Sequence, residues 1–245
     1  MRIKFTIYRY QIIVFILVLI LTNSVRIISP GTELKNYNRI QFPYTVALTF
    51  DDGPYPGYTE KLIKLLEMKN IKATFFVIGK HAESHPELIK LIDSGGHEIG
   101  GHTYSHRNLT KLKNQEIIND IELTNNIIRN IINKNTYLIR PPGGKINKRV
   151  REVITKSGYK IILWTVLPKD HDFRTTKEKI VTYTINETTN FGIILLHQGI
   201  QKTLDALPEI IDTLRARRYN FVTVSELLAE KEKLLLTQRF VEPSY

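Results

Sequence analysis

The chain has 245 residues, which is enough for one catalytic domain of ordinary size with a short extension. Its 42% apolar and 24% charged residues exclude a disordered chain, and the absence of cysteine excludes a disulfide scaffold and any thiolate ligand to a metal. The formal net charge of +11 favours an anionic neighbour. Because the basic residues are scattered and no nucleic-acid-binding motif accompanies them, we do not expect nucleic acid as a partner; a polyanionic wall or a lipid surface accounts for the charge.

Residues 1–28 predict a segment that directs the chain into or across a membrane. Arg2, Lys4 and Arg9 precede an apolar run from Ile12 to Leu21, and this order is typical of a secretory signal or a signal anchor. No small-residue cleavage site of the usual kind follows, so an uncleaved single-pass anchor is favoured over a cleaved signal peptide. In either case we expect the rest of the chain outside the cytoplasm, at the cell membrane or secreted to the cell wall.

The remainder predicts one domain of alternating strands and helices. Residues 29–43 read as a linker, residues 44–230 as the catalytic domain and residues 231–245 as a helix end and tail. This alternation predicts a parallel sheet, open or closed into a barrel. The expected strands are 45–50, 73–78, 97–101, 137–139, 160–163, 192–196 and 221–224, and the expected helices are 60–68, 86–94, 115–133, 148–157, 177–186, 204–217 and 225–236.

The first polar motif, Thr49-Phe50-Asp51-Asp52-Gly53-Pro54, follows the first expected strand. In parallel α/β proteins the reactive side chains gather at the C-terminal ends of the strands. The Gly-Pro pair turns the chain and leaves both carboxylates able to face one pocket. There, one can bind a cation while the other stays free as a base. The alternative is a structural Asx turn or helix cap.

Two histidines four residues apart, His102 and His106, follow the third expected strand. If the segment forms a helical turn, both imidazoles can meet one metal ion. A pair of surface histidines is the alternative. Together with Asp52, they form a set of two histidines and one carboxylate, which suits a divalent transition metal with open positions for water and substrate.

Further reactive residues lie just past later strands. Arg140 precedes the stiff run Pro141–Gly144, which can hold its guanidinium against a carboxylate, although a rigid connecting turn is the alternative. Trp164, which Asp170 follows, and His197 also lie at strand ends, where a core tryptophan and a satisfied core histidine are the alternatives. We assign no role to the remaining histidines, which are His81, His85, His97 and His171.

From about Tyr44 to Leu228 the chain resembles the polysaccharide deacetylase family, the NodB-homology or carbohydrate esterase family 4 proteins. The resemblance implies a distorted (β/α) barrel, usually of seven strands, and a divalent ion, expected to be zinc with cobalt, nickel or manganese as alternatives. It also implies hydrolysis of N-acetyl groups from an extracellular or cell-wall polysaccharide, and we expect N-acetylglucosamine in peptidoglycan as the substrate. No obligate protein partner is expected. The five family motifs have counterparts in order at Thr49–Pro54, His102–His106, Arg140–Gly144, Trp164–Asp170 and Leu195–His197.

The resemblance also implies a role for each of these residues. Asp51 would be the general base, oriented by Arg140. His197 would be the general acid, with its pKa set by Asp170. The metal ligands would be Asp52, His102 and His106, and the substrate pocket would be lined by Trp164, Leu195, Pro142 and Gly143.

The fourth motif departs from the family pattern Trp-x-x-Asp-x-x-Asp-Trp. Leu167 and His171 stand where an aspartate and a second tryptophan are usual. The departure leaves open how His197 is tuned and how the pocket wall is shaped. The departure supports one alternative, a catalytically weak glycan-binding protein on the same fold. A separate alternative, a related metal hydrolase that acts on a small cyclic amide, is disfavoured because an exported, anchored enzyme meets wall polymers first.

Overall fold

A computed structural model describes residues 44–239, which fall in one compact unit, Pro43–Tyr245. The predicted anchor at 1–28 and the linker at 29–43 lie outside the described residues. Among the helices of residues 44–239, none is long and apolar enough to cross a membrane.

Seven parallel strands form one sheet in the order β5-β4-β3-β2-β1-β6, and β7 pairs with the first half of β1. An isolated parallel bridge joins Val166, in the segment after β5, to Ile194 in β6. The segment that follows β5 is thus joined to β6 by this one bridge, and the α/β fold of parallel strands is as expected. The strands are β1 (Tyr44–Asp51), β2 (Thr74–Val77), β3 (Glu98–Gly101), β4 (Leu138–Ile139), β5 (Lys160–Ile161), β6 (Gly192–His197) and β7 (Tyr219–Val222).

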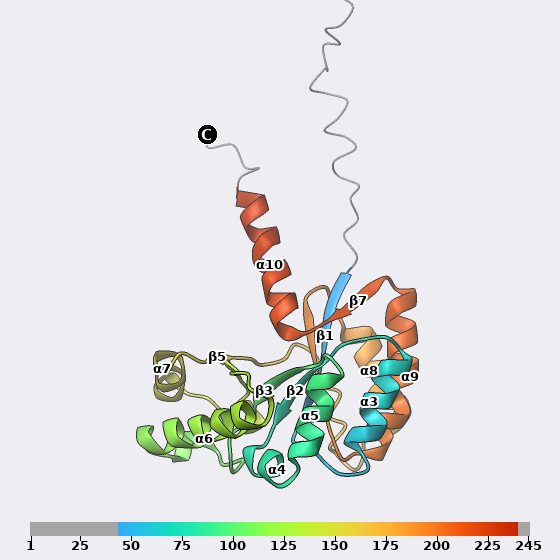
Figure 1. Cartoon of the computed structure of the whole chain (residues 1–245). Coiled ribbons are helices and arrows are strands. Elements are labelled where there is room, and N and C mark those ends of the chain that lie inside the picture. Colours follow the sequence, from blue (N-terminus) through green and yellow to red (C-terminus); the bar gives the residue numbers. More distant parts are fainter. Residues whose placement is uncertain (1–43, 240–245) are drawn as a thin grey trace, which may run out of the picture. The chain divides into compact units, whose positions relative to one another are not determined.

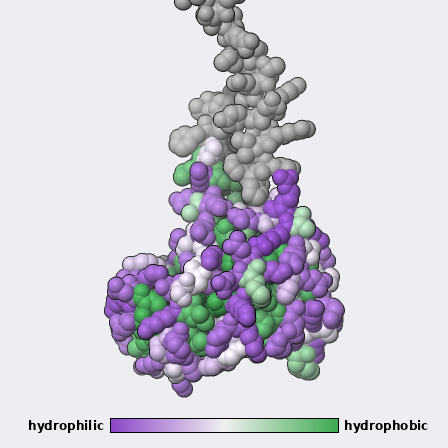
Figure 2. All heavy atoms as spheres, turned by 45° about the vertical axis from the view of Figure 1, so that its right-hand side comes forward, coloured by the Kyte–Doolittle hydropathy of each residue, from purple (hydrophilic) through white to green (hydrophobic). Residues whose placement is uncertain are grey.

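Helices cover the outside of the sheet (Figure 1). α3, α8 and α9 gather beside β1 and β6, whereas α6 and α7 lie towards β4 and β5. The face drawn in Figure 2 is largely hydrophilic, with apolar side chains exposed only in small groups. The helices are α3 (Thr59–Met68), α4 (Gly79–Ser84), α5 (Pro86–Ser94), α6 (Asn114–Ile132), α7 (Lys148–Lys156), α8 (Lys177–Glu187), α9 (Gln201–Ala216) and α10 (Val224–Arg239), and short 3-10 turns span Leu109–Lys111 and Pro142–Gly144.

The alternation of side chains along β1 separates the apolar core from the polar interior. Val46, Leu48 and Phe50 belong to the main apolar core between the sheet and its helices. Thr49 and Asp51 point to the opposite face, where one arginine contacts both of them. The sheet therefore presents its polar side chains on the inner face, at the C-terminal end of β1.

Several element boundaries differ from those predicted. Helix α4 was not predicted, because Ala82 is its one apolar side chain and a single position gives no periodicity. Strand β5 ends at Ile161 instead of Leu163, because the carbonyl groups of Ile162 and Leu163 accept hydrogen bonds from an arginine side chain. At the end of the domain, β7 stops at Val222 rather than residue 224.

The early end of β7 follows from the cap of the last helix. Thr223 and Glu226 form reciprocal bonds, in which each side chain accepts a hydrogen bond from the backbone N–H of the other. This arrangement is a capping box, so the helix begins at Val224 and the strand has to end before it.

Candidate active site

Asp51 and Arg140 form a buried ion pair at the end of β1. Nη1 of Arg140 lies 2.7 Å from Oδ1 of Asp51 and also donates to Oγ1 of Thr49 at 2.8 Å. Nε and Nη2 donate to two main-chain carbonyl groups, each at 3.3 Å. The guanidinium carbon also lies 4.1 Å from the centre of the Phe76 ring. Arg140 is fully buried, and its many contacts fix the position of the Asp51 carboxylate.

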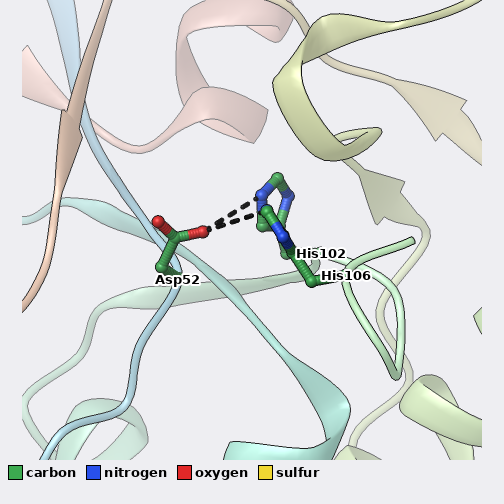
Figure 3. A group of neighbouring side chains, drawn as sticks. All are labelled: Asp52, His102 and His106. Atoms are coloured by element: carbon green, nitrogen blue, oxygen red, sulfur yellow. Dashed lines mark ion pairs between the residues drawn. The ribbon is translucent and has the colours of Figure 1, made fainter. Parts of the chain in front are cut away.

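Asp52, His102 and His106 meet next to this pair, since Nε2 of His102 lies 3.7 Å from Oδ2 of Asp51. Figure 3 shows the three side chains. The three side chains come from the loops that follow β1 and β3, and the Asp52 carboxylate points at both imidazoles. Oδ1 of Asp52 lies 3.4 Å from Nε2 of His102 and 3.3 Å from Nε2 of His106. Ligands on a tetrahedral zinc ion with bonds of about 2.0–2.1 Å lie about 3.3 Å apart, so the spacing fits such an ion.

The protonation of these groups also fits a cation. Nδ1 of His102 lies 2.7 Å from the main-chain carbonyl oxygen of Arg140. A carbonyl only accepts, so Nδ1 carries the proton and Nε2 presents a lone pair to Asp52. Oδ1 of Asp52 is buried and has no hydrogen-bond donor among residues 44–239. Oδ1 of Asp52 and the lone pair on Nε2 of His102 are both electron-rich, and they repel each other unless a positive charge lies between them. The three side chains therefore suit a divalent cation.

The charge states of Asp52 and His106 also suit a bound cation. Burial raises the pKa of Asp52, but the surrounding imidazoles of His102, His197 and His106 outweigh this effect and bring the pKa below its usual value. Burial and the neighbouring His102 lower the pKa of His106. Near neutral pH, Asp52 is therefore a carboxylate and His106 a neutral imidazole, which are the forms that bind metal.

The two histidines meet Asp52 without the helical turn that their spacing suggested as a route. Thr103 and His106 both have positive φ, 64° and 53°, and the segment forms an irregular loop. The buried carboxylate of Asp120 on α6 holds this loop, because it accepts hydrogen bonds from the N–H groups of Tyr104 and Ser105 and from the Ser105 hydroxyl. Asp120 lies far from the motif in sequence, so the spacing of the histidines gave no sign of it.

His81, to which the sequence assigned no role, forms a hydrogen bond with the backbone of Asp52. Nδ1 of His81 lies 2.8 Å from the main-chain carbonyl oxygen of Asp52 and must donate to it. Asp52 has a φ of 74°, a left-handed conformation that is uncommon for residues other than glycine. The hydrogen bond therefore helps to hold the strained residue that carries the carboxylate.

Asp170, which is buried, and His197, which is partly exposed, form a second pair next to Asp51. Oδ1 of Asp170 lies 2.7 Å from Nδ1 of His197, and Oδ2 accepts from the N–H of His197 and the hydroxyl of Thr203. Burial lowers the pKa of His197, but the hydrogen bond and charge of Asp170, with smaller contributions from Asp51 and Asp52, raise it above its usual value. The loss of the usual aspartate at Leu167 leaves this pair intact.

Replacement of Asp170 tests this pairing. In Asp170→Asn we expect the pKa of His197 to fall, so the alkaline limb of the activity profile moves to lower pH by about one unit and the activity at neutral pH falls about tenfold or more. Because the folded state raises this pKa, the pair stabilises the wild-type protein below the unfolded pKa of about 6.5, and that contribution is lost as pH rises through the folded pKa. Acetate release from an acetylated glycan, followed from pH 5 to 9, measures the shift.

The exposed aspartate Asp205 on α9 provides the matched control. Asp205→Asn should keep the wild-type profile. An unchanged alkaline limb in Asp170→Asn would show that Asp170 does not set the pKa of His197.

The residues expected to line the pocket lie around these pairs. The ring of Trp164 packs so closely on Gly144 that a Cβ there would come within 2.6 Å of it. Leu195 is buried and shares the inner face of β6 with His197, since the two are two residues apart on one strand. Pro142 is buried, and the N–H of Gly143 has no acceptor among the described residues.

The comparisons with known proteins agree with this geometry. A family model described as Polysaccharide deacetylase matches residues 41–162. The peptidoglycan-N-acetylglucosamine deacetylase of Bacillus cereus is 37% identical over 203 residues, which cover 81% of this chain and 92% of that protein. The chain belongs to the polysaccharide deacetylase family. This confirms the resemblance drawn from the five motifs.

A second relative is also named for peptidoglycan. The peptidoglycan-N-acetylmuramic acid deacetylase PdaC of Bacillus subtilis is 36% identical over 188 residues, which cover 77% of this chain and 39% of PdaC. A solved structure of PdaC matches with a TM-score of 0.74 and 34% identity, and the match covers 82% of this chain and 98% of the solved one. The chain is therefore a polysaccharide deacetylase, a hydrolase.

Proposed function

We propose that this deacetylase removes N-acetyl groups from N-acetylglucosamine in peptidoglycan, outside the cytoplasm and with a bound divalent metal ion. The relative from Bacillus cereus is named for this sugar, whereas PdaC is named for N-acetylmuramic acid. The basic flank and apolar run at 2–21 support export, with a membrane anchor or a signal peptide. No second function has an observation in its favour.

One observation carries the metal-dependent part of the proposal. Oδ1 of Asp52 is buried, has no donor in the part of the chain that the structure describes, and faces Nε2 of His102 and of His106. We assign these three side chains as the ligands, and zinc as the expected ion, with cobalt, nickel or manganese as ions that the same donor set accepts. When bound, such an ion lowers the pKa of a water molecule and polarises the carbonyl group of the amide.

Asp51 is assigned as the general base. Arg140 occupies Oδ1 of Asp51, so Oδ2, which lies 3.7 Å from Nε2 of His102, is the oxygen left to accept a proton from the attacking water. Arg140 keeps the carboxylate in this orientation. The base and one metal ligand, Asp52, are thus held side by side as consecutive residues at the end of β1.

His197 is assigned as the general acid. An amine leaves only when it is protonated, so the acid has to carry a proton near neutral pH. Asp170 occupies Nδ1 of His197 and raises its pKa, which leaves Nε2 to donate the proton to the departing sugar nitrogen. The products are acetate and a free amine on the sugar.

The loop after β4 is assigned a supporting role. The N–H of Gly143 has no acceptor among the described residues and is available to the negative oxygen that develops as water attacks the amide. Trp164 and Leu195 are assigned as the wall that receives the acetyl methyl group.

Acetate release ranks the candidate substrates. The purified protein is incubated with peptidoglycan, with oligomers of N-acetylglucosamine and with muramic-acid-containing fragments that lack acetylated glucosamine. We expect release from the first two and little from the third. Release only from the third would assign the enzyme to N-acetylmuramic acid instead, and release from no glycan would refute the proposed function.

A further inference from the structure

Phe173 is the most exposed large apolar side chain in residues 44–239, with 90% of its surface accessible. It lies in the segment between β5 and α8 that also carries Asp170 and His171. Burial normally stabilises a side chain of this size and character, so the exposed ring offers an apolar surface that a ligand can cover.

The turn that presents Phe173 is held firmly on both sides. Oδ1 of Asp172 accepts a hydrogen bond from the N–H of Arg174, and the side chains of these two residues form an ion pair at 2.8 Å. Nζ of Lys202, on α9, donates to the carbonyl oxygens of Asp172 and Thr175 at 2.6 and 2.8 Å. The exposure of the ring is therefore a property of a tightly bonded turn rather than of a loose loop.

The same turn lies against the catalytic acid. The ring centre of His171 is 4.7 Å from that of His197, in an edge-on arrangement. Two peptide units separate His171 from Phe173, so their Cα atoms lie at most about 7 Å apart. The turn that carries Phe173 therefore borders the active site, on the side of the catalytic acid.

We propose that Phe173 is a stacking platform for a neighbouring sugar ring of the glycan chain whose acetamido group occupies the active site. Pyranose rings of a β-linked glycan present flat faces of C–H groups, and an open aromatic ring fits such a face. The guanidinium of Arg174 lies 5.7 Å from the centre of the Phe173 ring and adds hydrogen-bond donors for the sugar hydroxyls. The inference rests on the proposed function, because it concerns the polymer bound at that site.

The test compares substrates of increasing length. Acetate release is measured on N-acetylglucosamine oligomers, from the shortest that the wild type turns over up to the hexamer, for wild type, Phe173→Ala and Phe173→Trp. For Phe173→Ala we expect kcat/KM on the hexamer to fall about tenfold, through KM, with less than a twofold change on the shortest oligomer. Phe173→Trp should keep the preference for long oligomers. Met68→Ala removes another exposed apolar side chain, on α3, and should match wild type.

The possible outcomes distinguish failure of the stacking platform from failure of the proposed function. If wild type releases acetate but Phe173→Ala keeps the full length dependence, the platform is wrong and the proposed function stands. If wild type releases no acetate, hexamer binding is measured by calorimetry in Asp51→Asn and in Asp51→Asn with Phe173→Ala. About tenfold weaker binding in the double variant would support the platform although the proposed function failed, and equal binding would overturn it.

Discussion

Asp51→Asn is expected to lower kcat for acetate release by about 10²–10⁴-fold, which is the contribution of a positioned general base. The amide cannot accept the proton of the attacking water at neutral pH, yet it keeps an oxygen that can accept the hydrogen bond from Nη1 of Arg140. Because Arg140 then stays buried without a carboxylate, the free energy of unfolding should also fall by about 3 kcal/mol. Acetate release at saturating substrate and urea unfolding measure the two effects.

Asp52→Asn is the matched comparison, since it changes the adjacent carboxylate in the same way. Zinc affinity, measured by competition with a chromogenic chelator, should stay within about threefold of wild type in Asp51→Asn and fall by about 10²-fold in Asp52→Asn. An Asp51→Asn enzyme with more than a tenth of wild-type kcat would show that another group takes the proton.

Arg140→Ala is expected to destabilise the fold by about 3–5 kcal/mol, because it leaves the buried Asp51 carboxylate without a counter-charge. The carbonyl groups of Ile162 and Leu163 lose their donor as well. Acetate release should fall at least 10²-fold, since the base is no longer held in place. Urea unfolding and acetate release are both measured at a temperature where the variant is folded.

Two further variants make this test specific. Arg140→Lys should restore little activity, because one ammonium group cannot replace a planar fork that reaches Thr49, Asp51 and two carbonyl groups. Arg151→Ala removes an exposed arginine on α7 and should change the free energy of unfolding by less than about 0.5 kcal/mol. Full activity in Arg140→Ala would contradict the assigned orientation of Asp51.

The positions of the reactive residues could be predicted from the sequence because they depend on local patterns. Apolar runs such as those ending at Phe50 and Leu196 indicate strands, and parallel strands bring their C-terminal ends to one edge. Asp51 and His197 were therefore expected to meet, and they lie opposite each other in the register of β1 and β6.

The supporting contacts could not be predicted, because they join residues far apart in the chain. His81 reaches Asp52 from α4, a helix without a periodic apolar pattern, and Asp120 reaches the histidine loop from α6. The left-handed conformation of Asp52 is likewise set by tertiary contacts and runs against its local preference. The sequence thus indicates which side chains react, whereas tertiary contacts determine how these side chains are oriented.

The most direct test of the metal-dependent mechanism is acetate release from peptidoglycan by protein first stripped with a chelator and then titrated with zinc. We predict that activity is lost on stripping and returns with about one equivalent of zinc, and that His102→Ala stays inactive at the same zinc concentration. Undiminished acetate release by metal-free protein, with zinc content confirmed by elemental analysis, would contradict the assignment of Asp52, His102 and His106 as the ligands of a catalytic ion.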